Sequence, residues 1–214
     1  MAVRVCERAA ESGASLVAVA TDDERIRAAV EAHGFRALMT RADHASGTDR
    51  IAEAAAQLAL GEDEIVVNVQ GDEPLIDPAL IREVAATLGR SREASVSTAC
   101  HPIHDARAFA NPNVVKVVLD ARGFALYFSR AAIPRPRDGG SIEAYRHIGI
   151  YGYRAGFLAR YASLAPSPLE RIEALEQLRV LWHGYRIAVA VSAADVPSGV
   201  DSAQDLEVVR RMYS

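Results

Sequence analysis

The chain has 214 residues, half of them hydrophobic, which suits a single α/β domain over residues 1–214 with a sizeable core. Its net charge of −4 at pH 7 argues against a general affinity for nucleic acid. It has no apolar run of about 18 residues and no secretory signal, so we expect no membrane insertion and a cytoplasmic location. Two cysteines, Cys6 and Cys100, cannot make a disulfide framework.

Helices and strands alternate in the pattern of the first 90 residues. Apolar periodicity and caps predict helices over 1–12, 22–33, 49–60 and 78–88, and strands over 16–20, 35–39 and 65–69. This order is typical of a mostly parallel sheet with crossover helices. The pattern opens on a helix, whereas a doubly wound domain usually opens on a strand.

The second half contains more hairpin signals. Strands are predicted over 94–100, 114–119, 124–128, 146–153 and 185–191, and helices over 155–162, 167–182 and 201–212. Lys116 is the single lysine of the chain and lies in a β-branched run. It is either a phosphate ligand or, more commonly for such a position, a strand residue whose amine reaches to water.

The stretch over residues 66–74 is an apolar strand that ends in polar residues. Gln70, Asp72 and Glu73 follow the strand, and Gly71 allows a sharp turn there. Ligands of open α/β sheets bind beyond the carboxyl ends of the strands, and a pair of carboxylates suits Mg²⁺. A plain acidic turn after a core strand explains the same residues equally well.

Several motifs together resemble one family, the 3-deoxy-manno-octulosonate (Kdo) cytidylyltransferases, and they occur in family order over nearly the whole chain. They lie at residues 19–22, 40–44, 46–50, 67–74, 111–113, 115–118, 125–130, 146–151, 167–179 and 199–201. The resemblance implies a sugar-nucleotidyltransferase-like (Rossmann-like) sheet flanked by helices, with a small dimerising subregion. It also implies a homodimer that transfers CMP from CTP to Kdo, with Mg²⁺, for lipopolysaccharide synthesis.

The resemblance also implies roles for individual residues. Asp72 and Asp201 look like the metal carboxylates, and Asp72 and Arg130 like the catalytic residues. The sugar-binding set comprises Gln70, Arg130, His147, Tyr151, Glu176 and Gln177, and the nucleotide-binding set comprises Arg41, Ser46, Gly47 and Thr48.

Each of these residues also has an ordinary structural explanation. Asp201 suits the N-cap of the last helix, and Ser46 to Thr48 suit a turn and cap before the helix at 49–60. Arg130 could be a solvated strand end, His147 a core histidine, and Glu176 an exposed helix residue.

One part of the family pattern has no counterpart among these residues. The family begins with a strand and a loop carrying arginines and a lysine around the CTP phosphates. We therefore expect the strands at 16–20 and 65–69 each to lack a neighbour, and we expect weak catalysis by residues 1–214 alone. We hypothesise that the gene encodes such a segment upstream; a stop codon directly before Met1 would contradict this.

Two other functions stay open at this point. The chain could be a non-catalytic remnant that only binds the sugar or dimerises. It could also be a cytidylyltransferase for a related sugar acid, such as an 8-amino analogue of Kdo or a sialic-acid-like sugar.

Overall fold

The computed structural model describes all residues except 45, 139–142, 194–198, 201 and 214. The described helices are α1 (Ala2–Ala10), α2 (Glu24–Glu31), α3 (Gly47–Gln57), α4 (Pro78–Arg90), α5 (Ala106–Ala110), α6 (Ala155–Tyr161), α7 (Pro168–Glu173), α8 (Gln177–Trp182) and α9 (Ala203–Met212). The described strands are β1 (Ala18–Thr21), β2 (Arg36–Met39), β3 (Ile65–Asn68), β4 (Ala94–Pro102), β5 (Lys116–Leu119), β6 (Ala125–Ser129), β7 (Tyr145–Arg154) and β8 (Arg186–Val191).

The larger sheet has six strands in the order β6-β5-β7-β4-β8, and β3 pairs with the remaining edge of β7. Strands β3, β4, β5 and β8 run in one direction, while β6 and β7 run the opposite way. The α/β fold with a largely unidirectional sheet is therefore confirmed. Because β7 lies between β4 on one side and β3 and β5 on the other, most neighbouring pairs are nevertheless antiparallel.

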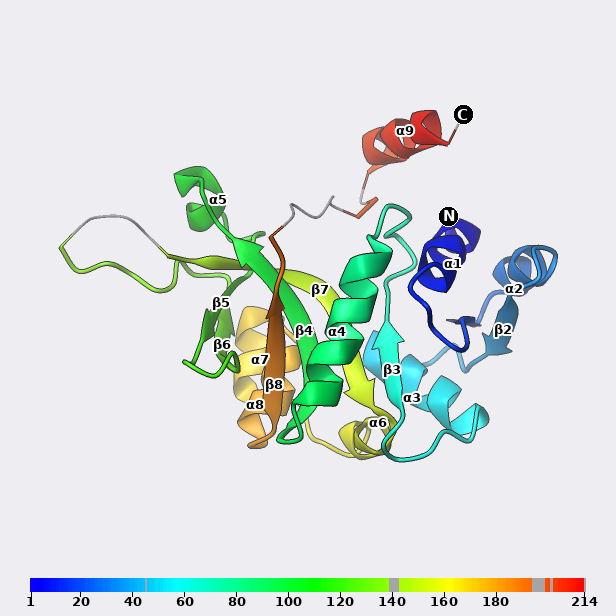
Figure 1. The fold of residues 1–214 in the computed structure, drawn as a ribbon, viewed down its shortest axis with the longest axis horizontal. Helices are drawn as coiled ribbons and strands as arrows, with labels where there is room; N and C mark the ends of the chain where they lie inside the picture. Colours follow the sequence, from blue (N-terminus) through cyan, green and yellow to red (C-terminus); the bar gives the residue numbers. More distant parts are fainter. Residues whose placement is uncertain (45, 139–142, 194–198, 201, 214) are drawn as a thin grey trace.

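Helices cover both faces of this sheet (Figure 1). On one face α4 packs Leu80, Ile81 and Val84 against Ile148 and Ile150 of β7. The helices α6 and α8 cover the other face in the larger apolar cluster. Alternation of side chains along the strands directs successive residues into these two layers.

The strands β1 and β2 form a separate, parallel two-stranded sheet. With α1 and α2 they make an N-terminal lobe, residues 2–39, at one side of the molecule (Figure 1). Neither β1 nor β3 has a second strand partner within the described residues. The expectation that both strands lack a neighbour is therefore confirmed.

The elements predicted from the sequence are present with shifts of a few residues, apart from one helix that was missed and one that was wrong. The short helix α5 was not predicted. The single helix predicted over 167–182 is in fact two helices, because Ala174 adopts a left-handed conformation with φ of 51° and ends α7. We find no sequence signal for this break, since alanine is a strong helix former. No helix in the described part of the chain is long and apolar enough to cross a membrane.

Candidate functional site

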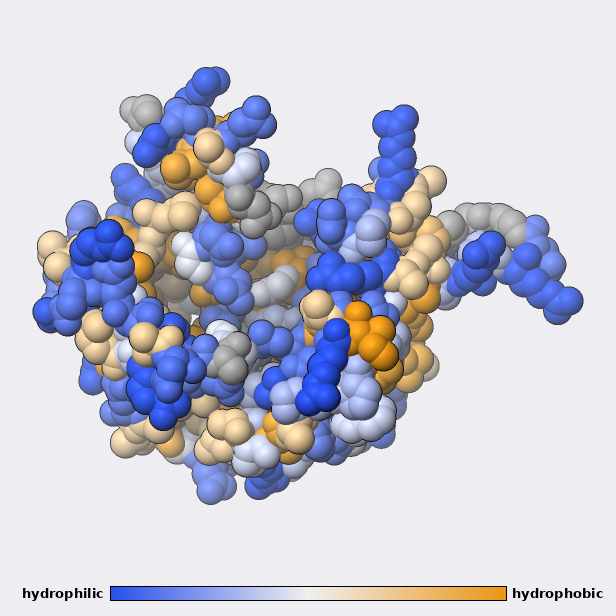
Figure 2. Space-filling model, turned by 180° about the vertical axis from the view of Figure 1, so that it is seen from behind, coloured by the Kyte–Doolittle hydropathy of each residue, from blue (hydrophilic) through white to orange (hydrophobic). Residues whose placement is uncertain are grey.

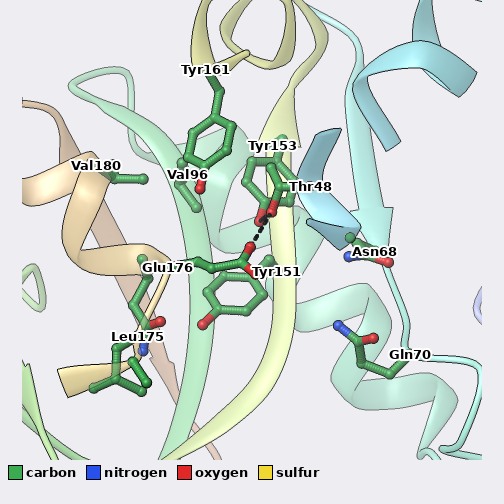
Figure 3. Close-up of a pocket in the computed structure, with 13 residues that line it drawn as sticks. Thr48, Asn68, Gln70, Val96, Tyr151, Tyr153, Tyr161, Leu175, Glu176 and Val180 are labelled. Atoms are coloured by element: carbon green, nitrogen blue, oxygen red, sulfur yellow. Dashed lines mark hydrogen bonds between the residues drawn. The ribbon is translucent and has the colours of Figure 1, made fainter. Parts of the chain in front are cut away.

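A pocket of about 260 Å³ opens between the start of α3, the end of β3, the middle of β7 and the start of α8 (Figure 3). It lies beyond the carboxyl end of β3, where the sequence places its acidic motif. The lining is Gly47, Thr48, Asn68, Gln70, Val96, Tyr151, Tyr153, Tyr161, Ala174, Leu175, Glu176, Gln177 and Val180. Amide, hydroxyl and carboxylate groups thus surround a small volume with apolar walls.

A polar contact joins two sides of the pocket. The Thr48 hydroxyl donates a hydrogen bond of 3.3 Å to Glu176 and lies 3.5 Å from the Tyr153 hydroxyl (Figure 3). Thr48 is held there because Ser46 caps α3 by accepting a hydrogen bond from the Asp49 amide. Partial burial is the main reason that the pKa of Glu176 is raised above its ordinary value.

The break between α7 and α8 places Glu176 at the pocket. Glu176 is the residue before α8, and Ala174 turns the chain so that α8 starts in a new direction. A buried ion pair fixes the two helices together, because Arg179 donates hydrogen bonds of 2.9 Å and 2.5 Å to the Glu170 carboxylate. The Arg179 guanidinium also lies 4.7 Å from the centre of the Tyr161 ring.

The Tyr161 hydroxyl is buried and has no hydrogen-bond partner among the described residues. A buried hydroxyl without a partner costs free energy that a bound polar ligand would recover. Since Tyr161 lines the pocket, the site offers one unused polar group beside Thr48 and Glu176.

His147 lies behind Tyr151, with their ring centres 5.4 Å apart, and has a defined protonation state. Its Nε2 lies 2.9 Å from Thr98 Oγ1, which is 2.7 Å from the Ile150 carbonyl oxygen. The Thr98 hydroxyl has one proton, and it donates this proton to the Ile150 carbonyl oxygen, which can only accept. The hydroxyl must therefore accept from His147, so Nε2 carries the proton and is the donor. The Nδ1 atom is then an acceptor. Desolvation of the imidazole lowers the pKa of His147 to about 3, which keeps the ring neutral.

Arg130 follows β6 and uses much of its guanidinium on the protein itself. It donates hydrogen bonds to the carbonyl oxygens of Glu173, Pro112 and Ala174 at 2.7, 3.2 and 3.4 Å. Its own amide donates to the Glu173 carboxylate at 2.9 Å. The structure therefore places Arg130 against the α7–α8 break. These carbonyls accept hydrogen bonds from three of the five guanidinium N–H groups and not from the other two.

Lys116 is fully buried. Its amine donates to the carbonyl oxygens of Asn111, Val114 and Arg130 at 2.9, 2.5 and 2.7 Å. Neither interpretation made from the sequence was right, since the amine reaches neither water nor a phosphate site. Burial lowers the pKa of Lys116, and the three carbonyls compensate by solvating the ammonium group. The residue ties the end of β6, and hence Arg130, to the turn before β5.

Two distant motifs meet at Asp72. The amide of Val200 donates a hydrogen bond of 2.8 Å to the Asp72 carbonyl oxygen, so the segment before the final helix crosses the acidic turn. The Asp72 carboxylate has no hydrogen-bond or ion-pair partner among the described residues. Asp201, the other predicted metal ligand, lies outside the described residues. Within the described part of the chain, no three His, Cys, Asp or Glu side chains gather to hold a metal.

A family model described as "Cytidylyltransferase" matches residues 1–187. The 3-deoxy-manno-octulosonate cytidylyltransferase of Leptothrix cholodnii is 59% identical over 221 aligned residues, which cover all of this chain and 82% of that protein. The chain belongs to the 3-deoxy-manno-octulosonate cytidylyltransferase family.

Solved structures agree with this assignment. A CMP:2-keto-3-deoxy-manno-octonic acid synthetase, solved in complex with CTP, is 42% identical and superposes with a TM-score of 0.91 over 99% of this chain and 86% of its own. A 4-diphosphocytidyl-2C-methyl-D-erythritol synthase shares only the fold, with 12% identity and a TM-score of 0.63 over 100% of this chain and 90% of its own. As a cytidylyltransferase, the chain is a nucleotidyltransferase enzyme.

The pocket of this cytidylyltransferase collects six of the residues predicted from the sequence. They are Gly47, Thr48, Gln70, Tyr151, Glu176 and Gln177. Asp72, Arg130 and His147 do not line the pocket and lie at the positions described above.

Arg41 and Ser46 do not line the pocket either. Arg41 is exposed and pairs with Asp43 at 3.2 Å. The Ser46 side chain is the N-cap of α3, in agreement with its ordinary structural explanation.

Sequence reasoning missed Asn68, Tyr153 and Tyr161 as parts of the lining. Asn68 interrupts an otherwise apolar strand, and this signal could have identified it. The two tyrosines look like ordinary core aromatics in the sequence, and only their position in the fold distinguishes them.

Proposed function

We propose that this chain transfers CMP from CTP to the 2-hydroxyl of Kdo, releasing pyrophosphate, as a step of lipopolysaccharide synthesis. One observation carries the proposal. Four side chains predicted to bind the sugar, from the turn after β3, from β7 and from the start of α8 with its N-cap, line one pocket beside the acidic motif. Such a polar site with apolar walls suits a compact sugar acid with several hydroxyl groups.

The pocket side chains would bind and orient the sugar. Gln70, Gln177 and Thr48 offer donors and acceptors for hydroxyl groups, and the tyrosine rings provide flat apolar walls. We expect the Nδ1 atom of His147 to accept a hydrogen bond from a sugar hydroxyl. We expect Arg130 to approach the sugar carboxylate with the N–H groups that its carbonyl contacts leave over.

Asp72 and Asp201 would hold Mg²⁺ together with the triphosphate. Carboxylate oxygens are suitable ligands, and Mg²⁺ commonly uses one or two carboxylates with substrate phosphates and water. Two observations support this assignment: the Asp72 carboxylate has no partner among the described residues, and the Val200 amide contacts the Asp72 backbone. A bound Mg²⁺ supplies charge neutralisation and a lower pKa for the attacking hydroxyl. The protein's part is to keep the hydroxyl and the phosphorus in line.

Pyrophosphate release tests this function. We expect release that requires CTP, Kdo and Mg²⁺ together, and a loss of about 100-fold or more in Asp72→Asn, because one metal ligand is gone. The matched control is Asp63→Asn, at an exposed aspartate in the loop before β3. Equal activity of both variants would contradict the role of Asp72. Kdo binding in calorimetry without turnover would favour the sugar-binding remnant instead.

Parallel assays with an 8-amino analogue and a sialic acid define the substrate. We expect Kdo to give the highest kcat/KM, and a higher value for either analogue would change the assigned sugar. We also infer a homodimer, supported by exposed apolar side chains on β6, α7 and α8 at Leu126, Ile172 and Trp182. Analytical ultracentrifugation of wild type and Ile172→Asp tests this, with a shift towards monomer expected in the variant.

A further inference from the structure

The side chain of Tyr161 is enclosed by the protein, yet its polar end belongs to the pocket. Only 1% of the residue is exposed. Tyr161 is the last residue of α6 and lines the pocket, and Figure 3 shows its hydroxyl directed into the pocket interior. Because this hydroxyl has no hydrogen-bond partner among the described residues, it is a buried polar group aimed at an open space.

Packing holds the Tyr161 ring in place. The Arg179 guanidinium, 4.7 Å from the ring centre, is itself bonded to the Glu170 carboxylate at 2.9 Å. The Phe157 ring meets the Tyr161 ring edge to face, with the two ring centres 6.2 Å apart. The hydroxyl lies on the axis about which the ring can flip, so a flip leaves its oxygen atom in the same place. The side chain is therefore ordered before any ligand binds, and binding costs it little conformational entropy.

A hydrogen-bond donor and an acceptor with spare capacity thus line the same pocket. Burial raises the pKa of the Tyr161 hydroxyl, which therefore keeps its proton and can donate it. The Glu176 carboxylate accepts one hydrogen bond within the described residues, from Thr48, and a carboxylate can accept several. Tyr161 and Glu176 do not bond each other directly, so both groups are available to a ligand.

The pocket can be reached from solvent. Gly47, Asn68 and Gln70 line it and also line a larger cavity beside the N-terminal lobe. Figure 2 shows, from behind, a hollow in the surface next to this lobe. A polar ligand that enters along these residues reaches the space into which the Tyr161 hydroxyl points.

We propose that Tyr161 is a specificity-determining residue of the sugar pocket. Its hydroxyl donates a hydrogen bond to one hydroxyl of the sugar, and that sugar hydroxyl donates in turn to the Glu176 carboxylate. The assignment rests on the proposed function, because it takes the ligand of the pocket to be the sugar acid. A hydroxyl group can fill both roles at once, since it has one proton and two lone pairs.

This arrangement selects the substituent at one carbon of the sugar. A sugar with hydrogen at that carbon leaves both protein groups without a partner. A sugar with an ammonium group there can donate to Glu176 but cannot accept from Tyr161. The site therefore discriminates against deoxy and amino sugars at that carbon, because they leave a buried polar group unbonded.

Tyr161→Phe tests the donor, because it removes the hydroxyl and keeps the ring. We expect calorimetry to show about tenfold weaker Kdo binding, the equivalent of one lost hydrogen bond. We expect the urea midpoint to equal or exceed that of wild type, because the hydroxyl has no partner to lose in the free protein. A merely structural defect would lower the midpoint together with the affinity.

Tyr185→Phe is the matched control. Tyr185 packs on Phe157 with the ring centres 4.8 Å apart, as Tyr161 does at 6.2 Å, but it does not line the pocket. We expect its Kdo affinity to equal that of wild type. Unchanged affinity in Tyr161→Phe, or a lower urea midpoint, would overturn the role of Tyr161 alone. If wild type itself does not bind Kdo, the proposed function fails and the role of Tyr161 fails with it.

Kdo analogues that each lack one hydroxyl other than the reacting one test the bridge to Glu176. We expect one analogue to bind wild type at least about tenfold more weakly than Kdo, and to bind Tyr161→Phe no more weakly than Kdo does. Glu176→Met, which removes the acceptor, should be insensitive to the same analogue. If every analogue loses the same factor in wild type and in Tyr161→Phe, no sugar hydroxyl accepts from Tyr161. If the two variants are insensitive to different analogues, no single hydroxyl bridges them; either result overturns the proposal.

Discussion

A neutral, enclosed histidine makes the stability of this cytidylyltransferase depend on pH in a predictable way. The imidazole of His147 is surrounded by Thr98, Phe128 and Tyr151, and its pKa is lowered to about 3. In the unfolded chain a histidine has a pKa of about 6.5. Protonation therefore favours the unfolded state, so the contribution of His147 to stability is complete above pH 6.5 and decreases as the pH falls from 6.5 towards 3.

The magnitude follows from the two pKa values. At pH 5.0 the unfolded chain gains about 2 kcal/mol by protonating this group while the folded chain gains almost nothing, and at pH 7.5 the difference is near zero. We expect wild type to lose about 2 kcal/mol more of its free energy of unfolding than His147→Gln between these pH values. Urea denaturation followed by circular dichroism measures both proteins at both pH values.

The comparison cancels the other titrating groups, because both proteins contain them. Phe128→Leu is the packing control, since it removes an aromatic contact with His147 at a ring distance of 5.0 Å but no titratable group. We expect this variant to be less stable than wild type and to keep most of its pH dependence. Equal pH dependence of wild type and His147→Gln would refute the desolvated state of the ring.

Three further predictions concern packing and charge. Gly152→Ala should cost about 1–3 kcal/mol in urea denaturation, because a Cβ atom there would lie 2.5 Å from the Ser97 hydroxyl in a filled core; an unchanged midpoint would contradict this packing. Lys116→Met should cost about 3 kcal/mol, because three carbonyl oxygens lose their donor; a denaturation curve like that of wild type would show that water replaces the amine. The pKa of Glu176 is raised mainly by burial. The stability that this side chain contributes is therefore fully present below about pH 4.3, its pKa in the unfolded chain, and is lost as the pH rises through its pKa in the folded chain. Glu176→Gln should therefore melt higher than wild type at pH 8 and lose this advantage at pH 4, while binding Kdo more weakly; a lower melting temperature at both pH values would contradict the direction.

The sequence predicts the order of elements well because most of them carry local signals. The apolar runs of β3 and β8 and the proline at the first turn of α4 depend on residues that are close in the chain. The long helix predicted over 167–182 was wrong, because Ala174 has no local reason to turn. The buried pair of Glu170 with Arg179 holds both helices in this arrangement, and tertiary packing here overrides propensity.

The candidate site was predicted in part, and this prediction came from the family resemblance rather than from local signals in the sequence. Gln70 and Glu176 were named from the family resemblance, and their position in one pocket needs the three-dimensional fold. Lys116 could not be interpreted correctly, because the three carbonyl oxygens that solvate it come from two separate turns. Arg130 was expected to serve a ligand, yet most of its hydrogen bonds organise the α7–α8 break.

The pocket and a second cavity, of about 600 Å³ and bordered by β1, meet at β3. Asn68 and Gln70 line both spaces, so the position of one strand end depends on what borders the other edge. An unpaired edge leaves β3 supported by β7 alone, and strands with few partners open at a lower free energy than central strands. The position of Gln70 in the pocket therefore depends on how firmly β7 holds β3, a strand whose apolar sequence is suited to burial on both faces.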